Sequence, residues 1–339
     1  MHTSKSFSVG LLVALLALAV LPLGMAAADI DAGFSVSAVH PANQIDGSAA
    51  YFDLMMEPKE TQDLVVRVEN PNQEEITVTV ETVTASTNRN GIISYSATGL
   101  SDETLRQGFA DLSTVEEPRI IIPGNATREA KVSLTMPEEE YSGLLLGAIR
   151  IVKLPDDAEP AGETGVVNQY SYAIGVRLRV GNAAVVPDFD LGRVEAGMVN
   201  HKAAIVANIR NPEPVMVEGL NATAQVFQMG AEEPMLSLTQ EDVEMAPQSV
   251  FPMSLVDQEG YGFPPGEYRF TLNLNHEGRN WDFQQDFTIQ EEQAAVINGN
   301  AVNQNAPVVA QKPVIWPYII IGCFAVAVIL GIAKRRGWL

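Results

Sequence analysis

The chain has 339 residues, 46% of them hydrophobic, and its 42 acidic side chains against 21 lysines and arginines give a formal net charge of −21. A surface this acidic repels phosphate backbones, so the composition excludes nucleic acid as a partner. The single cysteine, Cys323, lies in an apolar stretch near the C-terminus. This excludes a disulfide framework and a catalytic thiol elsewhere in the chain.

Residues 1–28 have the pattern of a secretory signal peptide. His2 and Lys5 form a short polar start, an apolar run covers residues 9–23, and three alanines precede Asp29 as a cleavage site. An uncleaved transmembrane helix is the alternative, but about 15 apolar residues are fewer than a bilayer requires. We therefore expect export, and the absence of disulfides points to a bacterial cell surface.

Alternation of apolar and polar residues predicts many short β-strands after the signal peptide. The pattern is clearest in ITVTV at residues 76–80 and in YRFTLNL at 268–274, and turn residues such as Asn90-Gly91 separate the runs. Short strands with this punctuation predict an all-β fold made of two immunoglobulin-like β-sandwich domains.

A stretch rich in proline, glycine and acidic residues at 156–165 predicts a linker between two sandwiches that span residues 29–155 and 166–290. A weak internal repeat supports two copies of one topology. VVRVENP at residues 65–71 resembles VANIRNP at 206–212, and an alternating strand follows each Asn-Pro turn.

Two segments depart from the strand pattern. Residues 101–117 place Leu105, Phe109 and Leu112 at helical spacing, which predicts a short helix inserted in the first sandwich. Such an insertion either covers the sheet or recognises a ligand. Residues 291–312 are polar and rich in asparagine, glutamine and alanine, which predicts a flexible stalk.

Residues 314–333 form an uncharged apolar run that predicts a transmembrane helix, because about 20 residues at about 1.5 Å each cover the roughly 30 Å of a bilayer core. Trp316 and Tyr318 lie at the expected outer headgroup level, and the basic tail at 334–339 marks the cytoplasmic end. We expect a single-pass membrane protein with residues 29–312 outside the cell.

The sequence predicts no catalytic, cofactor-binding or metal-binding residue. His40, His201 and His276 lack metal-ligand spacing, and no zinc, nucleophile-elbow or phosphate-loop motif occurs. A Ser-His-Asp triad assembled from separated residues remains an open alternative. Asp188 and Asp190 could bind a cation, or they could be acidic residues at the edge of a strand with no binding role. Trp281 alternates with Phe283, which predicts core packing and not an exposed sugar platform.

Several short stretches together resemble one family, the WxL-interacting proteins of low-GC Gram-positive bacteria. The likeness covers nearly the whole chain and rests on the order and spacing of motifs that are individually weak. They are FSVSAVHPANQID (34–46), YFDL (51–54), NGIISY (90–95), YSGL (141–144), DFDLG (188–192), the Asn-Pro turn at 211–212 and PGEY (265–268) before Trp281, followed by the apolar run and the basic tail.

This resemblance implies an N-terminal peptidoglycan-binding domain and a C-terminal domain that binds host ligands, such as an extracellular-matrix protein. It also implies a secreted WxL-domain protein as a partner. The chain has no Trp-x-Leu of its own, so the resemblance implies that it is the protein that holds the WxL-domain partner and is not itself a WxL protein. No family motif fixes individual binding residues, so these stay unassigned. A wall-active enzyme or a polysaccharide-processing component of a surface complex is the alternative function.

Overall fold

The structure is a computed structural model, and it describes residues 33–138, 142–155, 169–181 and 184–301. By its internal contacts the chain divides into two compact units. Unit 1 comprises the chain up to Thr84 together with Gln107–Asn182. Unit 2 comprises Ala85–Arg106 together with the chain from Ala183 onward. A segment from the first half of the sequence is therefore part of the second unit.

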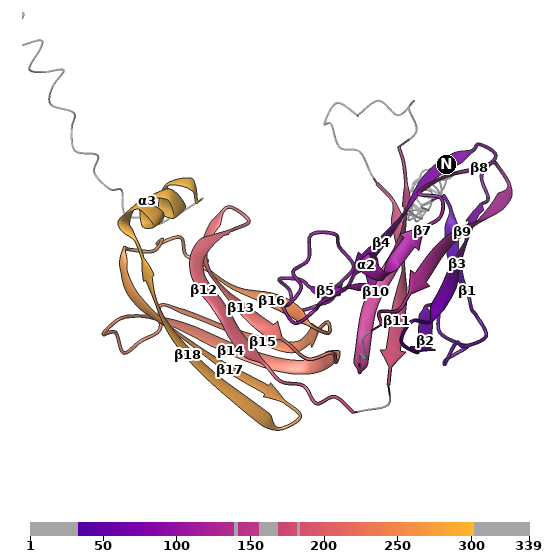
Figure 1. Cartoon of the computed structure of the whole chain (residues 1–339). Coiled ribbons are helices and arrows are strands. Elements are labelled where there is room, and N and C mark those ends of the chain that lie inside the picture. The colour runs from indigo at the N-terminus through magenta and orange to yellow at the C-terminus, as the bar shows by residue number, and fades with distance from the viewer. Residues whose placement is uncertain (1–32, 139–141, 156–168, 182–183, 302–339) are drawn as a thin grey trace, which may run out of the picture. The chain divides into compact units, whose positions relative to one another are not determined.

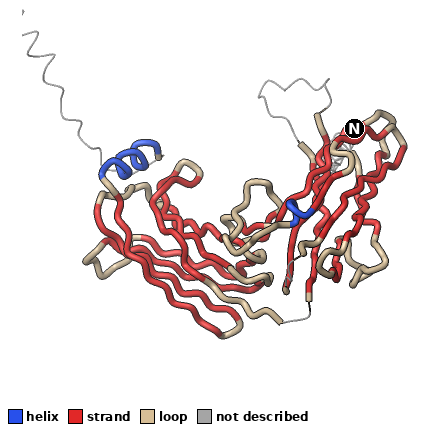
Figure 2. The backbone as a smooth tube through the Cα atoms, in the orientation of Figure 1, coloured by secondary structure: helices blue, strands red, loops and turns tan. Residues whose placement is uncertain are grey.

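Unit 1 is built from two sheets that lie face to face (Figures 1 and 2). The four-stranded sheet has the order β1 (Ser35–Val39), β3 (Thr61–Asn70), β9 (Ala126–Thr135) and β7 (Ser113–Val115). The five-stranded sheet has the order β2 (Phe52–Met56), β11 (Ser171–Val180), β10 (Gly143–Lys153), β4 (Ile76–Thr84) and β8 (Arg119–Ile122). Only the pairing of β2 with β11 is parallel among those described.

Helix α2 (Phe109–Leu112) fills a gap in this sandwich. Phe109 is fully buried, and a Cβ added at Gly147 would lie 2.4 Å from its ring. Gly147 on β10 therefore leaves the space that the phenylalanine occupies. The helix predicted over residues 101–117 is limited to four residues, because the part before Gln107 belongs to unit 2 and Ser113–Val115 form strand β7.

Unit 2 also has two antiparallel sheets that lie face to face (Figure 1). The three-stranded sheet has the order β12 (Asp190–Val199), β13 (Lys202–Asn211) and β16 (Ser249–Val256). The four-stranded sheet has the order β15 (Leu236–Met245), β14 (Val217–Gln228), β17 (Gly266–His276) and β18 (Arg279–Ile289). A small ribbon of β5 (Ser86–Thr87) and β6 (Ile93–Ser94) lies in the inserted segment.

One cluster of buried apolar side chains fills the space between the sheets of unit 2, with Phe251, Tyr268 and Phe270 among its largest members. The hydroxyl of Tyr268 donates to the carbonyl of Pro264 at 2.6 Å, which satisfies its one polar group.

Helix α3 (Glu291–Asn300) follows β18 directly and packs on unit 2 through Ala294 and Ile297. It occupies the first ten residues of the stretch for which the sequence predicted a flexible stalk. The amide of Asn298 accepts from the backbone N–H of Phe263 at 2.9 Å and donates to its carbonyl at 2.8 Å. These two bonds tie the helix to the loop before β17.

The predicted all-β fold agrees with the structure, but the predicted fold class needs one correction. No helix in the part of the chain that the structure describes is long and apolar enough to cross a membrane. The transmembrane helix predicted at residues 314–333 is therefore unsupported and lies outside the described residues, as do the predicted signal peptide (1–28), linker (156–165) and basic tail (334–339).

Candidate functional site

The outer face of the four-stranded sheet of unit 2 carries an array of short polar side chains. Along β14, Leu220, Ala222, Ala224 and Val226 are fully buried, so the residues between them point away from the core. A similar alternation holds on the other three strands of the sheet. We call the following part of the outward set the amide face: Asn221, Thr223, Gln225, Ser237, Thr239, Arg269, Thr271, Asn273, Asn275, Asn280, Asp282, Gln284 and Asp286.

The strand register sets these side chains in rows across the sheet. Opposite residues of an antiparallel pair share a face, with their Cβ atoms about 4.5–5.5 Å apart. One row consists of Thr239, Thr223, Asn273 and Asp282, and the next consists of Ser237, Gln225, Thr271 and Gln284. The face is thus a regular grid of amide and hydroxyl groups.

Hydrogen bonds between strands hold several of these side chains in place. Asn273 Nδ2 donates to Asp282 Oδ1 at 2.7 Å, and Asn275 Nδ2 donates to Asn280 Oδ1 at 2.8 Å. Side chains that are already ordered lose less entropy when a ligand binds. The array is therefore partly preorganised for contact with a polar ligand.

Charge on the amide face is largely balanced. Arg269 donates from Nε and Nη2 to the two oxygens of Asp286 at 2.8 and 3.1 Å. The hydrogen bond from Arg269 lowers the pKa of Asp286, and the same bond raises the pKa of Arg269. Asp282 is the one other charged member of the set, and Glu267 points outward on β17 two residues before Arg269. In a chain of net charge −21, this face suits a ligand recognised by neutral hydrogen bonds.

The four-stranded sheet of unit 1 has a different outer face. There Lys131 pairs with Asp63 at 2.9 Å and Arg67 pairs with Glu129 at 3.5 Å. The hydrogen bond from Lys131 is the main reason that the pKa of Asp63 is lowered. Exposed ion pairs of this kind contribute little to stability. This face is therefore an ordinary solvated surface that carries charged side chains of both signs.

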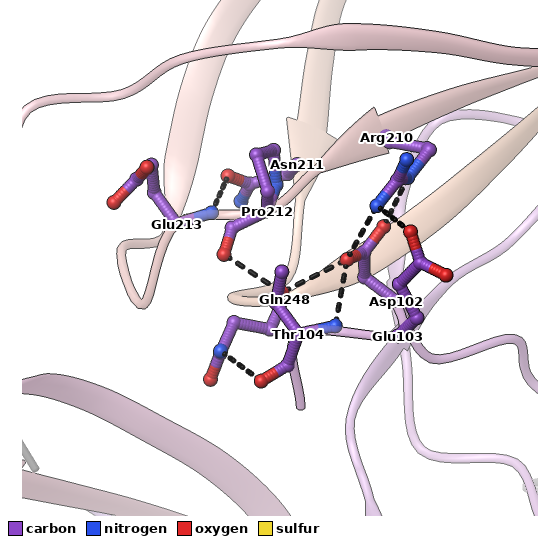
Figure 3. Close-up of polar contacts among 8 residues, drawn as sticks. All are labelled: Asp102, Glu103, Thr104, Arg210, Asn211, Pro212, Glu213 and Gln248. Atoms are coloured by element: carbon purple, nitrogen blue, oxygen red, sulfur yellow. Dashed lines mark hydrogen bonds and ion pairs between the residues drawn. The ribbon is translucent and has the colours of Figure 1, made fainter. Parts of the chain in front are cut away.

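A second polar cluster joins the inserted segment to β13 (Figure 3). Arg210 donates from Nε to Asp102 Oδ2 at 2.6 Å and from Nη2 to Asp102 Oδ1 at 3.1 Å. It also reaches Glu103 at 2.8 Å, and the backbone N–H of Thr104 donates to Asp102 Oδ1 at 2.9 Å. Asp102 is only 3% exposed.

The electrostatics of this cluster are those of a structural ion pair. Burial by itself raises the pKa of Asp102, but the hydrogen bonds from Arg210 and Thr104 outweigh it and lower the pKa below its usual value. The hydrogen bond to Asp102 likewise raises the pKa of Arg210. Both groups stay charged across the physiological range, so neither is poised to exchange a proton.

The residues singled out in the sequence are not gathered into one site. His40 follows β1 in unit 1, His201 lies in the turn between β12 and β13, and His276 ends β17. Among the described residues no group of three or more His, Cys, Asp or Glu side chains could hold a metal ion.

The prediction that Trp281 packs in the core is confirmed, because its ring lies against the core cluster. The centroids of the Trp281 and Phe189 rings are 4.9 Å apart, in an edge-to-face arrangement. Its Nε1 donates to Asp188 Oδ1 at 2.7 Å. Asp188, considered as a cation ligand from the sequence, therefore serves as the acceptor for this ring.

Two family models match the chain. Residues 34–153 match the model described as "WxL Interacting Protein, peptidoglycan binding domain", and residues 162–299 match "WxL Interacting Protein, host binding domain". The first range includes the inserted segment that packs in unit 2. None of the curated proteins compared with the chain matches it.

Several solved structures are similar at low identity. The Salmonella enterica SafA pilin in complex with the SafB chaperone is 13% identical, covers 75% of this chain and 97% of its own, and has a TM-score of 0.30. The CupB2 chaperone of Pseudomonas aeruginosa is 12% identical, with coverages of 69% and 96% and a TM-score of 0.29. The E. coli chaperone DraB is 15% identical, with coverages of 76% and 98% and a TM-score of 0.28. Similarities this low carry no argument about function.

Proposed function

Because the chain belongs to the WxL-interacting protein family, we propose that it is a non-catalytic cell-surface protein that holds a secreted WxL-domain protein. Unit 1, which contains most of the peptidoglycan-binding range, contacts the cell wall. Unit 2, which contains the host-binding range from Ala183 onward, contacts a host ligand such as an extracellular-matrix protein. Two weak contacts on one chain gain strength from effective concentration.

The amide face is the observation that supports ligand contact by unit 2. Its rows of asparagine, glutamine, threonine and serine offer both donors and acceptors, and cross-strand bonds such as Asn273 to Asp282 hold them in position. A glycan or an exposed peptide backbone presents matching neutral groups. Binding through such groups depends weakly on salt, because few net charges are involved.

The binding function is tested with the purified full chain. Its binding to a purified WxL-domain protein, to wall sacculi and to an immobilised extracellular-matrix protein is measured at low and high salt. We expect binding to at least the WxL-domain protein and sacculi, with little loss at high salt and no release of sugars or peptides from sacculi. Absence of binding to both, or release of wall fragments, contradicts the proposal.

The role of the amide face is tested separately. The double variant Asn273→Ala/Asn275→Ala removes four of its donor and acceptor groups without touching the core, since these side chains point outward. Arg67→Ala/Glu129→Ala on the outer face of unit 1 is the matched control. We expect the first variant alone to weaken binding to the host ligand, by about tenfold or more. Equal affinity of both variants would remove the amide face from the proposal while leaving the other contacts untouched.

A further inference from the structure

We infer that the inserted segment Ala85–Arg106 is an essential part of the host-binding domain, because it covers the edge strands of both sheets, β15 and β16. The inference goes beyond the proposed function, because it concerns what completes the second domain and not what that domain binds. The host-binding range of residues 162–299 leaves the segment out. By its contacts, however, the segment belongs to unit 2.

The segment first extends the three-stranded sheet at its β16 edge. β16 pairs only with β13 within the described sheet, so its other side is an edge. Ser101 forms an antiparallel bridge with Ser249. Around it, the N–H of Val250 donates to the carbonyl of Leu100 at 3.3 Å, and the N–H of Asp102 donates to the carbonyl of Gln248 at 2.8 Å. The segment thus covers this part of the β16 edge with a one-residue antiparallel bridge.

The segment also covers the edge of the other sheet. β15 is an edge strand, and the N–H of its Glu244 donates to the carbonyl of Gly91 at 2.8 Å. Just beyond β15, the N–H of Ala246 donates to Thr87 Oγ1 at 3.0 Å. Thr87 Oγ1 also lies 2.7 Å from Ser249 Oγ, and both side chains are buried. The threonine hydroxyl thus satisfies two buried polar groups of unit 2.

Side-chain hydrogen bonds and an ion pair also attach the segment to unit 2 (Figure 3). The Arg210 guanidinium binds the buried carboxylate of Asp102. Thr104 Oγ1 donates to the carbonyl of Pro212 at 2.9 Å, and the carbonyl of Thr104 accepts from Gln248 Nε2 at 2.9 Å. Without the segment, the N–H groups of Glu244, Ala246 and Val250 lose their acceptors in the protein and are open to water. An open pair of edges is also a template for aggregation.

The inference is tested on the full chain by amide hydrogen exchange. In one variant, residues 85–106 are replaced by a glycine-serine linker of equal length, so that the spacing between the flanking strands is kept. We expect the amides of Glu244, Ala246 and Val250, and the rest of β13 to β16, to lose protection while β3 and β9 of unit 1 keep theirs. A synthetic peptide of residues 85–106 added to this variant should restore protection in unit 2.

A milder variant tests the contacts without removing the segment. Thr87→Val keeps the side-chain shape but deletes the acceptor for Ala246, and Thr98→Val in the same segment is the control because its side chain is exposed. Thr87→Val should speed exchange at Ala246 by about tenfold or more, and Thr98→Val should not. If the linker variant retains wild-type protection throughout unit 2, the segment is not part of the domain and the inference fails.

Discussion

Asn70 and Asn211 make the same hydrogen bonds at corresponding points of the two units. Each is the last residue of its strand, β3 or β13, and each is 0% exposed. The carboxamide oxygen of each accepts from the N–H two residues on, in Asn72 and Glu213. The Nδ2 of each donates to the carbonyl four residues on and to a further carbonyl from a distant part of the same unit. The weak sequence repeat therefore corresponds to a repeated set of buried asparagine hydrogen bonds.

Replacing either asparagine with alanine should destabilise its own unit. Asn70→Ala and Asn211→Ala each leave several buried backbone groups without a partner, which should cost about 3 kcal/mol of unfolding free energy. Denaturant unfolding monitored by hydrogen exchange should place the loss in unit 1 for the first variant and in unit 2 for the second. Asn280→Ala on an exposed strand is the control and should change stability little. A loss in the wrong unit would contradict the equivalence.

Glycine at position 147 should be required for space. Gly147→Ala drives a methyl group into the ring of Phe109, so it should destabilise unit 1 by about 1–3 kcal/mol. Gly197→Ala in β12 is the matched control, because nothing lies within 4 Å of a Cβ added there. Thermal unfolding of both variants measures the difference. Equal melting temperatures would show that the Phe109 site relaxes freely.

The Asp102 ion pair should make stability depend on acid. Its folded pKa is lowered from 3.8, so its contribution is fully present above about pH 4 and is lost as the pH falls through the lower folded value. Asp102→Asn should therefore destabilise the chain strongly at pH 7, and its deficit relative to wild type should shrink as the pH falls below the usual carboxyl pKa. Denaturant titrations at several pH values measure this.

Asp286→Asn is the control for that experiment. Asp286 also pairs with an arginine, but both partners are exposed, so its removal should matter little at any pH. A deficit for Asp102→Asn that stays constant with pH would mean that the carboxylate charge contributes nothing.

Asn298 should hold helix α3 against unit 2. Asn298→Ala removes both bonds to Phe263, so amides of α3 should exchange faster while β12 and β17 remain protected. Asn300→Ala at the exposed end of the same helix is the control. Unchanged exchange in α3 would show that Ala294 and Ile297 suffice to dock it.

Local sequence patterns predicted much of the fold. Alternation identified strands such as 76–80 inside β4 and 268–274 inside β17, because one face of each strand is buried and the other is not. The 101–117 stretch shows where such reasoning stops. Its apolar spacing located the buried Phe109, but the position of Asp102 depends on Arg210, and no local pattern reports a partner so far along the chain.

The amide face was overlooked in the sequence for a related reason. Its signal was present, since the outward positions of β17 and β18 are mostly threonine, asparagine, glutamine and aspartate, with one arginine and one glutamate. Polar residues on the open face of a sheet are expected in any antiparallel structure. Only the strand register, which aligns Asn273 with Asp282 and Asn275 with Asn280, turns them into an ordered array.

The inserted segment has a consequence for the order in which the protein folds. Asp102 is synthesised 108 residues before the arginine that pairs with it. Contacts between such distant positions form late, because the intervening chain must first be brought together. Until β13 and β16 exist, the segment has nothing to dock on, and until it docks, the edges of β15 and β16 stay open. The joining of these two parts is therefore the step at which misassembly competes most directly with folding.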